Sequence, residues 1–289
     1  MRSKMSGWQE YRLALIDILI LLIIPVVIAT IHFFLSDAMY NQLLFTYGDA
    51  SIITIWTTVV LHTSNAHLTS NLLGYVVAIG FVYSLYRAEI RDRQRFWITV
   101  ATLLLVVPPI TKFVDYVMLY QHAGLLADEA TSRGFSGIVS AFGGMLLATI
   151  GHFIAGEYGK EAGVQVVLLI FLIGLGLLMA ANGILTLEVA GAIIIALALG
   201  STLFVSRTDL QQPGHLRYRI TDNRKNLAQI VGYGAVVCLF LYSIIPINPV
   251  QSGIFVNVLA HAVGFFSGVG TQAIISYMYV SSNVTRISV

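Results

Sequence analysis

Long apolar stretches constrain the fold of this chain more than any other feature of its sequence. Eight of them are long enough to cross a bilayer as helices, because an apolar core of about 30 Å needs about 20 residues. The turn signal Asn182-Gly183 separates the fifth apolar stretch from the sixth. Joined into one helix, these two stretches would be roughly twice as long as a bilayer is thick. The stretches lie at about 13–35, 66–86, 96–120, 136–155, 164–181, 184–206, 227–246 and 255–279. We predict an all-α polytopic membrane protein with about eight transmembrane helices in a single domain, 1–289.

Composition supports the same class of protein. Of the 289 residues, 57% are hydrophobic and 10% are charged, whereas a soluble domain carries about 25% charged residues. The first apolar stretch is too long for a signal-peptide core, so we expect it to remain as a span. The single cysteine, Cys238, excludes an internal disulfide and a cysteine-based metal cage. We expect no nucleic-acid partner, because no basic patch is interleaved with aromatic residues.

The distribution of positive charge predicts the orientation in the membrane. With the N-terminus in the cytoplasm, 14 of the 16 Lys and Arg fall in cytoplasmic segments, and only Lys112 and Arg133 lie towards the outside. This asymmetry follows the positive-inside rule, so we predict a plasma-membrane protein with both termini in the cytoplasm. Residues 36–65 carry aromatic side chains but no Lys or Arg, and are expected to lie in the outer membrane interface. The cytoplasmic segments include 1–12, 207–226 and 280–289.

Three polar clusters, distant in sequence, are predicted to share one depth in the membrane. His67 and Asn71 open the second span, Ser136 opens the fourth, and His261 stands within two turns of the start of the eighth. All three spans start at the outer surface in this topology, so we expect these side chains to lie a little below it.

Ser136, in the sequence Gly134-Phe135-Ser136-Gly137, is the candidate nucleophile. A serine needs a positioned base to take its proton, and the imidazole of His261 suits that task. The N–H groups of a helix start and its positive dipole end would favour an oxyanion there. The alternative is that Ser136 only caps its helix and His261 only pairs with a carbonyl. Polar groups are costly within a membrane, which favours a functional role.

Small residues predict how the two helices would meet. His261, Gly264 and Gly268 stand at i, i+3 and i+7, so both glycines share the histidine's face and allow close approach of another backbone. The fourth span offers Gly143 and Gly144 about two turns below Ser136. Packing through these glycines would bring the serine hydroxyl within reach of the imidazole.

His67 and Asn71 are the candidate oxyanion donors, together with the backbone N–H of Ser136. They are four residues apart and share a helix face. His62 is five residues before His67, off that face, so we expect it to brace the preceding loop. A zinc site is not expected, since the chain lacks two His at i, i+4 with an adjacent Glu. Lys112 and Asp115 are expected to pair at i, i+3.

These motifs resemble the rhomboid family of intramembrane serine proteases. The ordered set is His62-x4-His67-x3-Asn71, Gly134-x-Ser136-Gly137 and Ala260-His261-x2-Gly264-x3-Gly268. The resemblance implies a six-helix core with an outward-opening, water-filled cavity and no cofactor. It also implies that a Ser136–His261 dyad, with His67 and Asn71 as oxyanion donors, cleaves transmembrane protein substrates.

The sequence also departs from the family's pattern. Two additional spans separate the serine helix from the histidine helix, and Ser140 stands where the family often has an aromatic residue. A catalytically inactive relative that binds transmembrane segments for trafficking or quality control is therefore the alternative. A transporter ranks lower, because Pro108-Pro109 breaks one span without a counterpart elsewhere.

Overall fold

The protein is almost entirely helical in a computed structural model that describes residues 7–204, 224–244, 250–251, 254–255 and 257–287. Each of its long helices overlaps one of the eight apolar stretches. These helices are α1 (Gly7–Phe34), α4 (Asn65–Leu85), α5 (Arg93–Asp115), α6 (Ser136–Tyr158), α7 (Lys160–Ala181), α8 (Leu187–Phe204), α11 (Arg224–Ile244) and α12 (Val258–Ile287).

Short elements join the long helices. They are the helices α2 (Asp37–Leu43) and α3 (Ile52–Thr57), the 3-10 turn η1 (Thr58–Val60), and the π-helical turns η2 (Tyr86–Ile90) and η3 (Tyr116–His122). Two short antiparallel ribbons are also formed, β1 (Phe45–Thr46) with β2 (Thr131–Ser132), and β3 (Val250–Gln251) with β4 (Ile254–Phe255). In the first ribbon Phe45 faces Ser132, so the segment after α2 is joined to the segment before α6.

The prediction of an all-α polytopic membrane protein is confirmed at the level of its helices. In the described residues, six helices are long and apolar enough to span a membrane: α1, α4 with η2, α5 with η3, α6, α7 and α12. Helices α8 and α11 contain shorter apolar segments, Leu187–Ala196 and Ala228–Tyr242. Eight crossings therefore remain a prediction.

The predicted bounds of the cytoplasmic segments need correction, because α1 already begins at Gly7, inside the segment expected over 1–12. The tail expected over 280–289 continues α12 as far as Ile287, and α11 begins at Arg224, inside the loop expected over 207–226. Of the other predicted cytoplasmic parts, residues 1–6, 207–223 and 288–289 lie outside the described residues.

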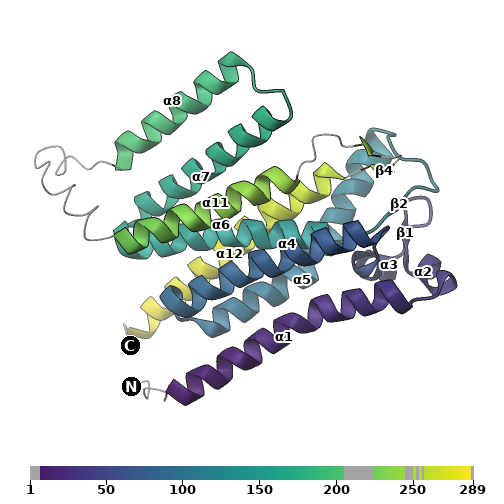
Figure 1. Cartoon of the computed structure of the whole chain (residues 1–289), viewed down its shortest axis with the longest axis horizontal. Helices are drawn as coiled ribbons and strands as arrows, with labels where there is room; N and C mark the ends of the chain where they lie inside the picture. The colour runs from purple at the N-terminus through teal and green to yellow at the C-terminus, as the bar shows by residue number, and fades with distance from the viewer. Residues whose placement is uncertain (1–6, 205–223, 245–249, 252–253, 256, 288–289) are drawn as a thin grey trace, which may run out of the picture.

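Helix α6 is the centre of the bundle. It contacts α4, α5, α7, α11 and α12, and most of its side chains are buried. Its aromatic core includes Phe142, whose ring lies 5.5 Å from that of Tyr75 on α4. Helix α8 packs chiefly against α7 at one edge of the bundle, and α1 lies at the other edge (Figure 1). Helix α6, which begins with Ser136, is thus surrounded by protein.

The predicted glycine contact between α6 and α12 is confirmed for Gly144, Gly264 and Gly268, whereas Gly143 faces Phe240 on α11, whose Cδ1 would lie 3.2 Å from an added Cβ. A Cβ added at Gly264 would lie 2.2 Å from the carbonyl oxygen of Gly137, and one added at Gly268 would lie 1.9 Å from that of Ala141. One added at Gly144 would lie 1.9 Å from the carbonyl oxygen of Phe265. The two backbones touch along this line, as small-residue packing in membranes permits.

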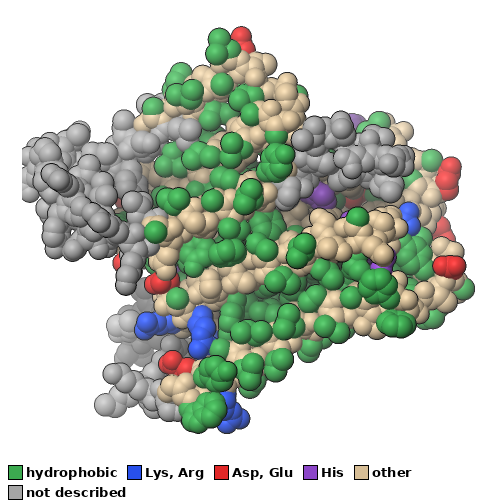
Figure 2. All heavy atoms as spheres, in the orientation of Figure 1, with side chains coloured by type: hydrophobic (Ala, Val, Ile, Leu, Met, Phe, Trp, Pro, Cys, Tyr) green, Lys and Arg blue, Asp and Glu red, His purple; other side chains and the backbone are tan. Residues whose placement is uncertain are grey.

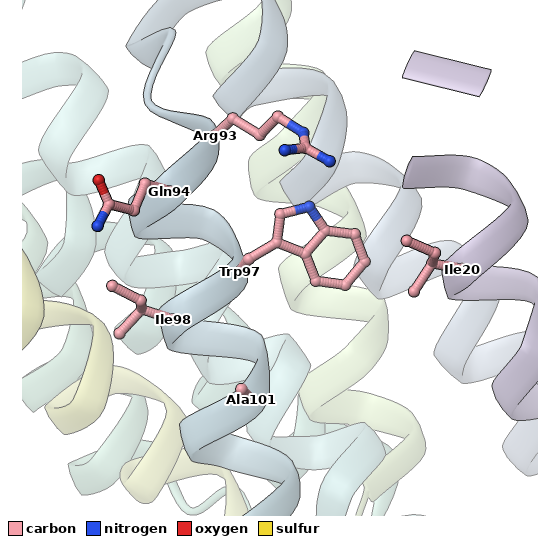
Figure 3. Close-up of a pocket in the computed structure, with 6 residues that line it drawn as sticks. All are labelled: Ile20, Arg93, Gln94, Trp97, Ile98 and Ala101. Carbon is pink, nitrogen blue, oxygen red and sulfur yellow. The ribbon is translucent and has the colours of Figure 1, made fainter. Parts of the chain in front are cut away.

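Helix α1 is fastened to the bundle by one buried carboxylate. Asp17 is 2% exposed and accepts hydrogen bonds from Arg93 at 2.6 Å, Trp97 at 3.0 Å and Tyr83 at 3.1 Å. Beside this contact, an open groove between α1 and α5 includes Ile20, with Arg93 and Trp97 pointing into it (Figure 3). The groove lies near the start of α5, far from Ser136.

The two ends of the bundle differ in character. The start of α1 and the end of α12 lie at one end, and α4, α6 and α12 all start at the opposite end, beside α2, α3 and the first ribbon (Figure 1). Basic side chains gather at the end with the termini, and the flank between the ends is apolar (Figure 2). The three predicted polar clusters therefore lie at one end of the bundle, as expected.

Candidate functional site

The backbone that leads into Ser136 is held against two predicted oxyanion donors. Gly134 has φ +115°, and its N–H donates to the carbonyl oxygen of Thr58 at 3.2 Å. A Cβ at Gly134 would lie 2.8 Å from Cε1 and 3.0 Å from Nε2 of His67, and 3.8 Å from Nδ2 of Asn71. Glycine is therefore required both by the backbone conformation and by the imidazole beside it.

Ser136 is the first residue of α6, and its side chain does not cap the helix. The cap position is Phe135, which has no side-chain cap. The first N–H groups of a helix have no acceptor within it, and those of Ser136 and Gly137 find none elsewhere in the described part of the chain. The partly exposed serine thus sits beside two unsatisfied donors at the positive end of a helix.

The first turn of α12, which carries His261, packs against the first turn of α6. A Cβ at Gly137 would lie 3.8 Å from the carbonyl oxygen of Ala260, and Gly137 packs directly on Gly264. Ser136 precedes Gly137, and His261 follows Ala260. Because Gly137 and Ala260 are in contact, Ser136 and His261 lie on facing turns of two touching helices. Within the described residues, no hydrogen bond joins the Ser136 hydroxyl to the His261 ring. Catalytic hydrogen bonds are often longer before substrate binds.

His62 and Asn71 form a hydrogen-bonded pair that the sequence did not predict. His62 Nδ1 lies 3.3 Å from the carbonyl oxygen of Val60 and must donate to it, so Nε2 accepts from Asn71 Nδ2 at 2.9 Å. Burial, and next the charge of His67, lower the pKa of His62 to about 4, so the ring is neutral at physiological pH. The predicted bracing role holds, since His62 binds both the carbonyl oxygen of Val60 in the loop and the amide of Asn71.

His67 has one ring nitrogen held and one directed at the site. Its Nδ1 lies 3.2 Å from the hydroxyl of Thr63, and its ring centroid is 5.0 Å from that of His62. In the tautomer in which the Thr63 hydroxyl donates to Nδ1, the proton is on Nε2, which would lie 3.0 Å from a Cβ at Gly134. His67 also interacts electrostatically with His261 across the site.

A fourth histidine, His32 at the end of α1, joins this group. Its Nε2 lies 2.9 Å from Oδ1 of Asn65, and its ring centroid is 6.3 Å from that of His62. Histidine side chains reach the surface near this end of the bundle (Figure 2). In the described chain, no group of three or more His, Cys, Asp or Glu has the geometry to hold a metal ion. The sequence analysis missed His32. The one signal for it was its place near the end of the apolar stretch 13–35, where a polar side chain is unusual.

Lys112 and Asp115 do not form the ion pair that their spacing predicted. Lys112 Nζ donates to the hydroxyl of Ser132, and Asp115 Oδ2 accepts from Asn257 Nδ2 at 2.5 Å. The only ion pair among the described residues joins Arg93 to Asp17. Each of the two side chains is held by a different segment, so spacing along one helix did not decide the contact.

Comparisons of the chain with protein-family models, with curated proteins and with solved structures found no match. The function is therefore inferred from the chemistry of the site.

Proposed function

We propose that this chain is an intramembrane serine endopeptidase of the rhomboid type, which uses Ser136 and His261 to hydrolyse peptide bonds in or near transmembrane segments of other membrane proteins. The observation that carries the proposal is the backbone contact between Gly137 and Gly264, which sets the serine and the histidine on facing turns. The unsatisfied N–H groups beside Ser136 support the same chemistry.

The reaction proceeds in two balanced steps. Ser136 Oγ attacks the carbonyl carbon of the peptide while His261 takes the hydroxyl proton and then gives it to the leaving amine as the C–N bond breaks. Water then attacks the acyl-serine ester, His261 takes a water proton, and that proton returns to Ser136 Oγ as the acid leaves. No cofactor takes part.

The oxyanion of each tetrahedral intermediate is stabilised by preorganised donors. The proposed donors are the Ser136 N–H, the Asn71 amide and His67 Nε2–H, since His67 Nε2 and Asn71 Nδ2 would lie 3.0 Å and 3.8 Å from a Cβ at Gly134, two residues before Ser136. Removing one such donor typically costs 100- to 1,000-fold in kcat, or about 2.7–4 kcal/mol. The proposed setting is the outer leaflet side of the plasma membrane, with eight spans and both termini in the cytoplasm.

Cleavage of a transmembrane reporter tests the dyad. We expect Ser136→Ala and His261→Ala each to lower the cleavage rate at least about 1,000-fold. Ser267→Ala is the matched control, because this serine on α12 only donates to the carbonyl oxygen of Val263 at 2.7 Å. Undiminished cleavage in either dyad variant would reject the assignment.

One observation favours the alternative of an inactive relative that binds transmembrane segments: Ser140, which stands where the family often has an aromatic residue, donates its hydroxyl to the carbonyl oxygen of Ser136 at 2.8 Å. A fluorophosphonate probe separates the two functions, since covalent labelling requires an activated serine. The protease reacts with the probe at Ser136 and loses labelling in His261→Ala. The binding protein retains reporter capture but is not labelled.

A further inference from the structure

A fully buried carboxylate on α5 contacts the start of the histidine helix. Asp115 is 0% exposed, and its Oδ2 accepts from Asn257 Nδ2 at 2.5 Å. Its Oδ1 is buried without a hydrogen-bond partner among the described residues. A buried carboxylate is costly unless it is compensated, so a role in packing alone does not explain it.

Asn257 transmits this contact to α12. It immediately precedes α12, and its side-chain Oδ1 accepts from the backbone N–H of Ala260 at 2.9 Å as an N-cap. The N–H of His261 bonds to the Asn257 carbonyl oxygen at 3.3 Å. An ionised Asp115 can only accept hydrogen bonds. The Asn257 amide must therefore point its nitrogen at Asp115 on α5 and its oxygen at the first turn of α12.

The face of α5 that carries Asp115 also contacts the start of α6. Thr111, one turn earlier on α5, would be 3.5 Å from a Cβ at Gly137, the residue after Ser136. Lys112 is buried on the same part of α5, where its Nζ donates to the hydroxyl of Ser132. The same face of α5 therefore contacts the starts of both helices of the dyad.

We propose that Asp115 is a positioning residue that, through the Asn257 cap, holds His261 in register with Ser136. The inference rests on the proposed proteolytic function. Asp115 does not touch the reacting atoms. It fixes the first turn of α12, from which His261 projects, and a loosened cap would move the imidazole away from the serine.

Exchanging the two side chains tests the hydrogen bond itself. Asp115→Leu removes the acceptor and is expected to lower kcat for reporter cleavage about 10- to 100-fold with KM nearly unchanged. Asn257→Asp at pH 8 sets two carboxylates against each other and should be similarly impaired. The double variant Asp115→Asn with Asn257→Asp restores both the bond, with its direction reversed, and the cap, so activity should return to within about threefold of wild type.

Two controls separate positioning from general instability. Asp128→Leu removes an exposed carboxylate at the same end, which accepts from Tyr120 at 2.8 Å, and should leave kcat unchanged. Thermal unfolding of every variant is measured in the same detergent. If Asp115→Leu lowers kcat no more than Asp128→Leu, or if the double variant is no better than Asn257→Asp, the inference is wrong.

Chemical modification of His261 provides a readout that needs no catalysis. Diethylpyrocarbonate modification is followed by mass spectrometry, with His62 and His67 as references in the same molecule. We expect His261 to react at least about threefold faster in Asp115→Leu and at the wild-type rate in the double variant. An unchanged rate in Asp115→Leu overturns the positioning role. If the wild type neither cleaves nor labels, the proposed function fails, and the modification rates still decide the role of Asp115.

Discussion

At the scale of single residues, Gly134 carries the sharpest steric constraint of the site. A Cβ there would collide with the His67 ring at 2.8 Å, on a backbone with φ +115°. Gly134→Ala should therefore lower the reporter cleavage rate at least about tenfold by displacing His67 and the serine turn, beyond the backbone cost of about 1–3 kcal/mol. Gly124→Ala is the matched control, because Gly124 has φ +60° and nothing within 4 Å. Equal activity in the two variants would contradict this prediction.

His62 predicts a pH dependence of stability at the same scale. Its pKa is about 4 in the folded protein against an ordinary value of 6.5, so the unfolded chain binds a proton first as the pH falls. The contribution of neutral His62 is complete above about pH 6.5 and is lost progressively towards pH 4. We expect Tm to fall across this window, and to fall less in His62→Gln than in the wild type. An identical pH dependence in His62→Gln would exclude His62 as a cause, and exposed His122→Gln serves as the control.

At the scale of elements, the crossing of α6 and α12 determines whether the dyad exists. A Cβ at Gly268 would lie 1.9 Å from the Ala141 carbonyl oxygen, whereas Gly270, on the same helix, has nothing within 4 Å. Gly268→Ala should separate the helices, lower Tm and reduce cleavage at least tenfold. Gly270→Ala should leave cleavage unchanged and raise stability by up to about 1 kcal/mol, because alanine favours helix. Wild-type cleavage in Gly268→Ala would show that the crossing does not hold the dyad.

The sequence predicted helices and their glycine crossing better than it predicted contacts made by loops. Apolar length defined all eight long helices, and the i, i+3, i+7 spacing after His261 identified the face that meets α6, because both follow from helix geometry. The contacts of His62 with Asn71 and of Asn257 with Asp115 were missed, since His62 and Asn257 precede their helices, where residue spacing carries no angular information. Lys112 likewise took a partner from a distant segment.

At the scale of the whole molecule, the topology can be tested through the α7–α8 hairpin. The start of α1 and the end of α12 lie at the same end of the bundle (Figure 1), where the predicted even number of crossings would place them. Helix α8 has 18 residues, or about 27 Å at 1.5 Å per residue, which is just short of a bilayer core of about 30 Å. Because the positive charges of residues 207–226 favour a cytoplasmic location for this loop, we predict that α8 crosses the membrane.

Cysteine accessibility in a Cys238→Ala background measures this crossing. An impermeant maleimide on intact cells should label Ile184→Cys, exposed between α7 and α8, and should not label Glu89→Cys in η2 or His215→Cys in 207–226. All three should react after permeabilisation. Labelling of His215→Cys from outside would mean that α8 returns to the outer side without crossing. If α11 and α12 both crossed in that case, His261 would lie at the cytoplasmic side and Ser136 at the outer side. The proposed position of the dyad thus depends on the α7–α8 hairpin making two full crossings.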